Sequence, residues 1–160
     1  MCIRDSTVGG VENQIGDNTG NNLVTGNGNN LGANNFSNIV GGFMNTIGTN
    51  SGNNTLNGGN NSIGSVSFNN ILGGDGNSVG DMNFHNTISG FQNSIANDAQ
   101  SNFVHGSGNN LGTSTFGNTV TGFNNDLSVG SISGAVVMGC LLYTSPSPRD
   151  ATLSRMPSSA

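Results

Sequence analysis

The sequence predicts an all-β protein, a parallel β-solenoid (β-roll) of 16-residue coils with two short strands in each coil. Three observations predict this fold class. Asn and Gly together fill 57 of the 160 positions, whereas only 7% of the residues are charged and 32% are hydrophobic. The same residue types return every 16 residues over seven consecutive units. Within a unit the recurrent positions are two apart, which is the period of a β-strand.

The repeat is numbered here from position 1 to position 16, with the first full unit beginning at Thr19. Position 4 is Asn in every full unit, and position 6 is Val, Leu or Ile. In stacked coils, equivalent Asn side chains form an amide ladder and equivalent aliphatic side chains form a buried ladder. The predicted structural ladder consists of Asn22, Asn38, Asn54, Asn70, Asn86, Asn102, Asn118, Val24, Val40, Leu56, Leu72, Ile88, Val104 and Val120.

The second half of the unit repeats in the same way. Position 8 is Gly, position 11 is Asn, position 13 is Leu, Ile or Val, and position 14 is mostly Gly. Positions 4, 6 and 8 share one face of a first strand, and positions 11 and 13 share one face of a second strand. Gly at positions 8 and 14 suits corners of the coil. Val136 is expected to continue position 6 beyond the last full unit, and no segment has the 3.6-residue period of a helix.

The two ends differ from the middle of the chain. Residues 1–6 read MCIRDS, and residues 140–160 read CLLYTSPSPRDATLSRMPSSA. Their first residues can be back-translated into strings that are reverse complements of each other, as the two ends of a translated sequencing adaptor are. We therefore expect residues 1–6 and 140–160 to be adaptor-derived, the latter segment disordered, and residues 7–139 to be a β-solenoid domain truncated at both ends.

The composition of residues 7–139 excludes several classes of protein. This segment has no Lys, Arg or Cys, and its carboxylates are Glu12, Asp17, Asp75, Asp81, Asp98 and Asp126. Without basic residues, binding to nucleic acid is disfavoured. No apolar run is long enough to cross a membrane as a helix. Without Cys, this segment has no disulfide framework and no cysteine metal site.

Apolar residues also occur at three variable positions, 2, 5 and 9, the last of which is Phe in three units: Phe43, Phe91 and Phe123. Position 2 has the parity of position 4, so its Phe residues are expected to cover the inner core; they are Phe36, Phe68, Phe84 and Phe116. Position 5 has the opposite parity and is expected to form an outward stripe. Because an exposed apolar stripe is typical of an interface, we expect lateral association into a homotrimer. The candidate interface residues are Leu23, Ile39, Ile71 and Phe103.

No catalytic, cofactor or metal site is predicted. His85 and His105 occupy positions 3 and 7 of adjacent units and do not stack, and the carboxylates are scattered over several positions. The segment Gly73–Gly76 has some similarity to a calcium-binding nonapeptide, but Ser78 stands where that motif needs Asp. The sequence therefore predicts a chain that is not an enzyme.

The unit reads N-x-Φ-x-G-x-x-N-x-Φ-G, where Φ is Val, Ile or Leu, and this pattern extends over about Val8 to Met138. It resembles the head repeats of YadA-like trimeric autotransporter adhesins, and it is similar to Gly-rich repeats of phage tail fibres and surface proteins. The resemblance implies a left-handed β-roll of three chains side by side, exposed outside the cell at the outer membrane, that binds a host receptor or another surface. The family repeat is usually shorter and richer in Ser and Ala.

We therefore expect a non-enzymatic surface or fibre solenoid, an adhesin head segment that mediates attachment. A structural repeat of a phage tail fibre is one alternative. An ice-binding solenoid is another, although Thr119 and Thr121 supply the only T-x-T at positions 5 and 7 of the full units. A polysaccharide-active enzyme is the least favoured, because the chain lacks clusters of acidic and basic residues.

Overall fold

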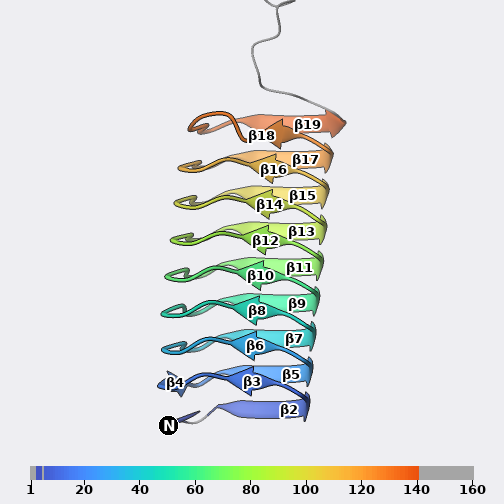
Figure 1. Ribbon diagram of the computed structural model, residues 1–160. Helices are drawn as coiled ribbons and strands as arrows, with labels where there is room; N and C mark the ends of the chain where they lie inside the picture. The colour runs from blue at the N-terminus through green and yellow to red at the C-terminus, as the bar shows by residue number, and fades with distance from the viewer. Residues whose placement is uncertain (1–2, 5, 141–160) are drawn as a thin grey trace, which may run out of the picture.

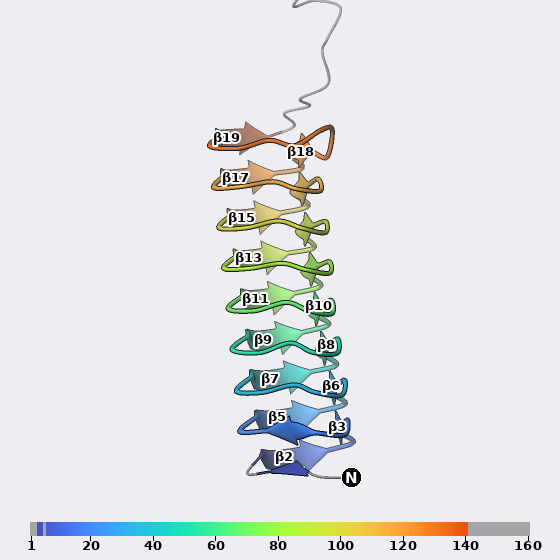
Figure 2. The same ribbon diagram turned by 90° about the vertical axis from the view of Figure 1, so that its left-hand side faces the viewer.

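The computed structural model describes residues 3–4 and 6–140, and in this part of the chain every regular element is a β-strand. The chain winds into a rod of stacked coils, with strands of successive coils lying directly above one another (Figures 1 and 2). One side of the rod is a nine-stranded parallel sheet. Its strands are β2 (Thr7–Val11), β5 (Leu23–Asn27), β7 (Ile39–Phe43), β9 (Thr55–Gly59), β11 (Ile71–Asp75), β13 (Thr87–Phe91), β15 (Phe103–Ser107), β17 (Thr119–Phe123) and β19 (Val136–Cys140).

A second side of the rod is an eight-stranded parallel sheet of two-residue strands. These are β3 (Gln14–Ile15), β6 (Asn30–Leu31), β8 (Thr46–Ile47), β10 (Ser62–Ile63), β12 (Ser78–Val79), β14 (Ser94–Ile95), β16 (Asn110–Leu111) and β18 (Asp126–Leu127). Adjacent strands pair residues 16 apart, as in Leu72 with Ile88 and Val79 with Ile95. The predicted fold class, a parallel β-solenoid of 16-residue coils with two strands per coil, is confirmed.

A third side of the coil is held by single-residue bridges that the strand pattern did not predict. Position 2 forms parallel bridges from coil to coil, for example between Phe68 and Phe84. Each coil turns at positions 3, 10 and 16, where the backbone is in the left-handed region, as in His85 (φ 59°), Gln92 (φ 52°) and Asp98 (φ 59°). Three such corners divide the coil into three short sides. Most corner residues are Asn or Gly, which adopt this conformation at little cost.

The left-handed corner at position 3 also corrects the placement of the position 2 Phe residues. If side chains simply alternated, position 2 would point inward like position 4. The left-handed corner at position 3 reverses this direction, so the side chain of position 2 points outward. Position 1 therefore points inward, and it is buried in every full coil. Phe36 and Phe116 are instead 51% and 56% exposed, while Phe68 and Phe84 are half-buried and stack on each other with ring centroids 5.9 Å apart. The expected cover over the core is wrong.

The last coil departs from the 16-residue spacing. Val120 pairs with Val137, which is 17 residues further along the chain. The extra residue lies in the corner between Leu127 and Ile132, because Ile132 takes the role of position 1 and accepts a backbone hydrogen bond from Phe116. Val136 is consequently 68% exposed at position 5, and Val137 packs against the core in its place. The expectation that Val136 continues position 6 is wrong.

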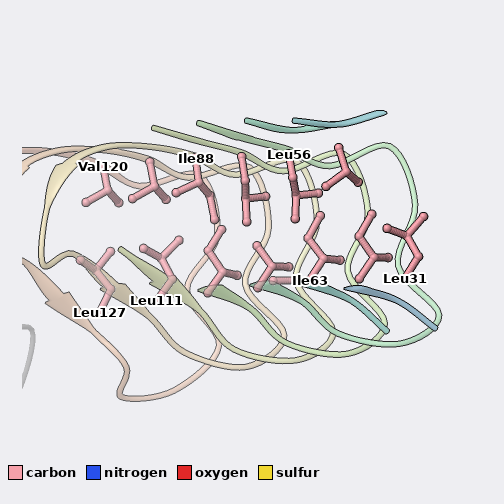
Figure 3. Close-up of a cluster of buried hydrophobic side chains, with 14 of the residues drawn as sticks. Leu31, Leu56, Ile63, Ile88, Leu111, Val120 and Leu127 are labelled. Atoms are coloured by element: carbon pink, nitrogen blue, oxygen red, sulfur yellow. The ribbon is translucent and has the colours of Figure 1, made fainter. Parts of the chain in front are cut away.

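The interior contains two facing rows of aliphatic side chains, at positions 6 and 13 (Figure 3). Every side chain in both rows of the full coils is at most 1% exposed. Each coil thus buries only two large apolar residues, and stacking is what removes them from water, since one isolated coil could not do so.

The predicted adaptor-derived segments fall largely outside the described residues, and their origin remains a prediction. Within the described part, β1 (Ile3–Arg4) pairs in parallel with β4 (Thr19–Gly20). Ser6 occupies position 4 of the first coil, where its Oγ accepts hydrogen bonds from the backbone N and Nδ2 of Asn22. At the other end, Cys140 is the last residue of β19.

Candidate functional site

Two buried amide ladders run the length of the rod and fix its geometry. At position 4, the Oδ1 of each Asn accepts hydrogen bonds from the backbone N and Nδ2 of the next Asn; for Asn70 and Asn86 these distances are 3.0 and 3.1 Å. The Nδ2 of Asn70 donates a further bond to the carbonyl oxygen of Asn83, at position 1 of the next coil. All seven predicted ladder Asn residues are at most 2% exposed.

The second ladder, at position 11, satisfies backbone carbonyl groups at positions 7 and 8. The Nδ2 of Asn77 donates to Oδ1 of Asn61 and to the carbonyl oxygens of Gly73 and Gly90. This set of bonds recurs in the neighbouring coils, with Asn45, Asn61 and Asn93 in the same role. Within the described part of the chain, no buried side-chain nitrogen or oxygen lacks a hydrogen-bond partner. Since unpaired buried polar groups are costly, this satisfaction makes the polar interior stable.

The glycines at position 8 are needed for the close approach of successive coils. Gly74 has φ +107°, and an added Cβ there would overlap the carbonyl oxygen of Gly90 in the next coil. That carbonyl oxygen is the same one that accepts the bond from Asn77. Position 8 therefore requires Gly for two reasons, the backbone angle and the space.

The outward side chains of the nine-stranded sheet form the most distinctive surface of the molecule. We call this surface, made by positions 5, 7 and 9, the outer sheet face. It carries the four candidate interface residues at position 5: Leu23, Ile39, Ile71 and Phe103 are 41%, 51%, 51% and 44% exposed. Position 9, at the corner end of the strands, adds Phe43, Phe91 and Phe123, each nearly half exposed. The structure thus places the predicted stripe outward, and the Phe residues of position 9, which share the parity of position 5, lie on the same face.

The position 5 residues do not form an unbroken apolar line. The register pairs Ile39 with Thr55, Thr55 with Ile71, and Ile71 with Thr87. Apolar and Thr side chains therefore alternate from Ile39 to Thr119, whereas Leu23 pairs directly with Ile39. The same alternation leaves no continuous Thr row on this face, so the arrangement does not favour ice binding.

The histidines are separated, as their repeat positions predicted. His105 lies on the outer sheet face, where its Nδ1 is 2.7 Å from Oγ of Ser89 in the preceding coil. His85 is at a corner, where its Nε2 is 3.3 Å from Nδ2 of Asn69. Among the described residues, no three His, Cys, Asp or Glu side chains gather in a group that could hold a metal ion.

Asp126 is the carboxylate whose titration is shifted by its surroundings. Hydrogen bonds from Ser128, including its backbone N–H at 3.0 Å from Oδ1, lower the pKa of Asp126 below its ordinary value. The Nδ2 of Asn110, at 3.3 Å, adds to this effect. The carboxylate lies near the C-terminal end of the rod and helps to close the enlarged corner that follows Leu127.

The comparisons with known proteins yield likenesses to solved structures alone. No family model matches the chain, and no curated protein does. A solved structure that matches is the crystal structure of the polySia specific acetyltransferase NeuO, with 12% sequence identity and a TM-score of 0.43; the match covers 89% of this chain and 83% of that chain. At this level the likeness assigns neither a reaction nor catalytic residues to the chain.

This comparison nevertheless contradicts one sequence-based prediction. The absence of a catalytic constellation was taken to mean that the chain is not an enzyme, but the matching structure is that of an acetyltransferase. The inference from a repetitive sequence to a non-enzyme is therefore wrong. The YadA-like resemblance is supported only at the coarser level of a solenoid repeat protein. No helix in the described residues is long and apolar enough to span a membrane.

Proposed function

We propose that this chain is a rigid segment of an exported surface or fibre protein, of the adhesin-head kind that its repeat resembles. Its role is to hold a flat face of side chains in fixed geometry, outside the cell, where that face contacts other molecules. The observation that carries the proposal is the outer sheet face itself. Seven large apolar side chains at positions 5 and 9 of β5 to β17 are each more than 40% exposed on one side of the rod.

The internal ladders support a structural role. Because each buried Asn is bonded to both neighbouring coils, the coils cannot slip in register without breaking several hydrogen bonds at once. A rod fixed in this way keeps the outer side chains at constant spacing. Exposed apolar surface of this extent on a water-soluble fold is typical of a contact surface.

Attachment of coated beads tests the proposal. Beads carrying the purified chain are washed over surfaces coated with collagen, laminin, mucin or albumin, and the retained fraction is counted. We expect retention above the albumin level on at least one of the other coatings. Asp81→Asn, at an exposed corner, should preserve retention, whereas Leu72→Asp, which disrupts the buried ladder, should abolish it. Retention at the albumin level on every coating would refute the adhesin role.

A further inference from the structure

We propose that the third side of the rod, where position 2 forms its single-residue bridges, binds a neutral linear polysaccharide, a chain of β-linked pyranose rings that lies along the rod. We call this site the aromatic stripe; it consists of Phe36, Phe68, Phe84 and Phe116 at position 2, with Val66 and Met82 at the preceding corner. The inference goes beyond the proposed function and does not depend on it, because the outer sheet face is a different side of the coil.

The rings of the stripe offer flat faces to the solvent. Phe68 and Phe84 are nearly parallel, with 9° between their planes and 5.9 Å between their centroids. Planes in contact are about 3.5–4.0 Å apart, so the rings are displaced sideways and each leaves part of its face uncovered. Two atoms of the Phe68 ring lie 3.4 Å from the point that a Cβ on Gly52 would occupy. The ring therefore lies over the preceding coil, and Gly52 beneath it is buried.

The corner beside this stacked pair is strained. Position 16 is Asn, Asp or Ser in the neighbouring coils, but it is Val66 and Met82 in the two coils that carry Phe68 and Phe84. Both corner residues have a left-handed backbone, with φ 58° and 56°, and both are more than 40% exposed. A β-branched residue is unfavourable in this conformation. Strain that is kept at an exposed place, next to exposed aromatic rings, is typical of a functional site.

The spacing of the rings along the rod suits a β-linked sugar chain. The coils stack nearly directly above one another, so the stripe is straight (Figures 1 and 2). Phe36 and Phe68 are two coils apart, as are Phe84 and Phe116, which is about 9.6 Å in each case. In an extended β-linked chain, each sugar ring advances by close to one strand spacing and is turned over relative to the ring before it. Equivalent faces therefore recur at every second ring, as the two pairs of Phe residues do.

The step of one coil between Phe68 and Phe84 is also accommodated. When the substituents of a pyranose ring are equatorial, both of its faces carry C–H groups, and either face can pack on an aromatic ring. The whole stripe from Phe36 to Phe116 spans five coils, or about 24 Å, which is the length of about six sugar rings.

Amide groups beside the rings match the hydroxyl groups at the edges of a sugar. Gln100 is exposed at position 2, between Phe84 and Phe116. On the corner that precedes the stripe, Nδ2 of Asn34 donates to Oδ1 of Asn50 at 3.1 Å, and both side chains are exposed. An amide both donates and accepts hydrogen bonds, as a hydroxyl group does. Apolar faces with a few polar groups at their edges are typical of small-molecule and cofactor sites.

The charge of this side favours an uncharged ligand. Among positions 16, 2 and 3 of the full coils, Asp98 is the single carboxylate, and residues 7–139 contain no Lys or Arg. A phosphate or a sugar acid would therefore find no cation, and the net negative charge of the chain would repel it. Outside the two central coils the stripe is one side chain wide, which is narrow for a protein interface. A neutral polysaccharide meets both restrictions.

Isothermal titration calorimetry with two neutral hexasaccharides tests the ligand class. Cellohexaose is β-linked and extended, and we expect it to bind the purified chain saturably. Maltohexaose has the same sugar units, but its α-linkages curve the chain away from a straight stripe. It should bind at least about tenfold more weakly, because fewer of its rings reach the aromatic residues.

Paired variants locate the site. Phe36→Ala with Phe116→Ala should weaken cellohexaose binding at least about tenfold, because two stacking rings are lost. The matched control is Phe43→Ala with Phe123→Ala, which removes two Phe side chains of similar exposure from the outer sheet face and should leave the affinity unchanged. Gln100→Ala should weaken binding about threefold, whereas Gln92→Ala, at an exposed corner away from the stripe, should not. Circular dichroism shows that each variant is folded.

Val66→Asn separates binding from stability. It should weaken cellohexaose binding by removing an apolar contact, and at the same time raise the thermal midpoint by relieving the strained corner. A residue with a merely structural role would not change the two quantities in opposite directions. The absence of saturable cellohexaose binding, equal affinity for maltohexaose, unchanged affinity in the Phe36 and Phe116 double variant, or loss of affinity in the Phe43 and Phe123 control would each overturn the proposal.

Discussion

Replacement of Asn70 by Ala tests whether the amide ladder stabilises the rod or merely accompanies the stacked strands. Asn70 is fully buried near the middle of the chain. Its side chain makes four hydrogen bonds: Oδ1 accepts from the backbone N and Nδ2 of Asn86, and Nδ2 donates to Oδ1 of Asn54 and the carbonyl oxygen of Asn83. Asn70→Ala removes all four.

The expected cost follows from what remains unpaired. The carbonyl oxygen of Asn83 still accepts from the backbone N of Phe68, and Nδ2 of Asn86 still donates to the carbonyl oxygen of Ala99. The backbone N–H of Asn86 is left without its acceptor, which costs about 1–3 kcal/mol in a buried site. With the other lost bonds and the small cavity, the total destabilisation should be about 3–5 kcal/mol.

Urea unfolding followed by circular dichroism measures this free energy, and hydrogen exchange locates it. The amide of Asn86 should lose its protection in Asn70→Ala. The matched control is Asn30→Ala, at an exposed position of β6, which should change stability by less than about 0.5 kcal/mol. If both variants unfold at the same urea concentration, the ladder contributes nothing and the reasoning is wrong.

Four further predictions concern single positions. Gly74→Ala should destabilise the rod by more than about 2 kcal/mol in urea unfolding, because of its positive φ and the overlap with the next coil, whereas Gly73→Ala, with open space around its Cβ, should be near neutral. Leu72→Asp buries an unpaired carboxylate and should therefore unfold the central coils, as measured by near-complete loss of the β-sheet circular dichroism signal. Asp81→Asn keeps an acceptor oxygen for the backbone N of Ser65 and should leave this signal unchanged. Val66→Asn should raise the thermal midpoint, with a gain of about 1 kcal/mol, because a β-branched residue now occupies a left-handed corner at φ 58°. Because the pKa of Asp126 is lowered in the folded protein, its ionised form stabilises the fold at pH values above the pKa of the unfolded chain. This stabilisation is lost as the pH falls through the folded-state pKa, so Asp126→Asn should reduce the acid sensitivity of the thermal midpoint. Equal acid sensitivity of the two proteins would contradict a stabilising role of the Asp126 carboxylate.

Much of the fold can be predicted from the repeat itself. The return of Asn and aliphatic residues to positions 4 and 6 every 16 residues is enough to predict stacked parallel coils, because only stacking buries one aliphatic ladder and pairs one amide ladder. The outward direction of Ile39 and Ile71 follows equally from the two-residue period of a strand.

What parity could not predict is the behaviour of the chain at its corners. A left-handed residue at position 3 reverses the inward and outward directions, which is why Phe36 is exposed and Asn35, at position 1, is buried. The residues found at that corner, such as Asn53 and Ser101, are also common in ordinary loops, so the sequence pattern alone does not mark the reversal.

The sequence by itself thus determined the architecture, the length of the coil and the two internal ladders, because these depend on periodicity. The tertiary structure decided which residue fills each remaining place. It shows that the last coil gains a residue in the corner before Ile132, so that Val137 rather than Val136 enters the core.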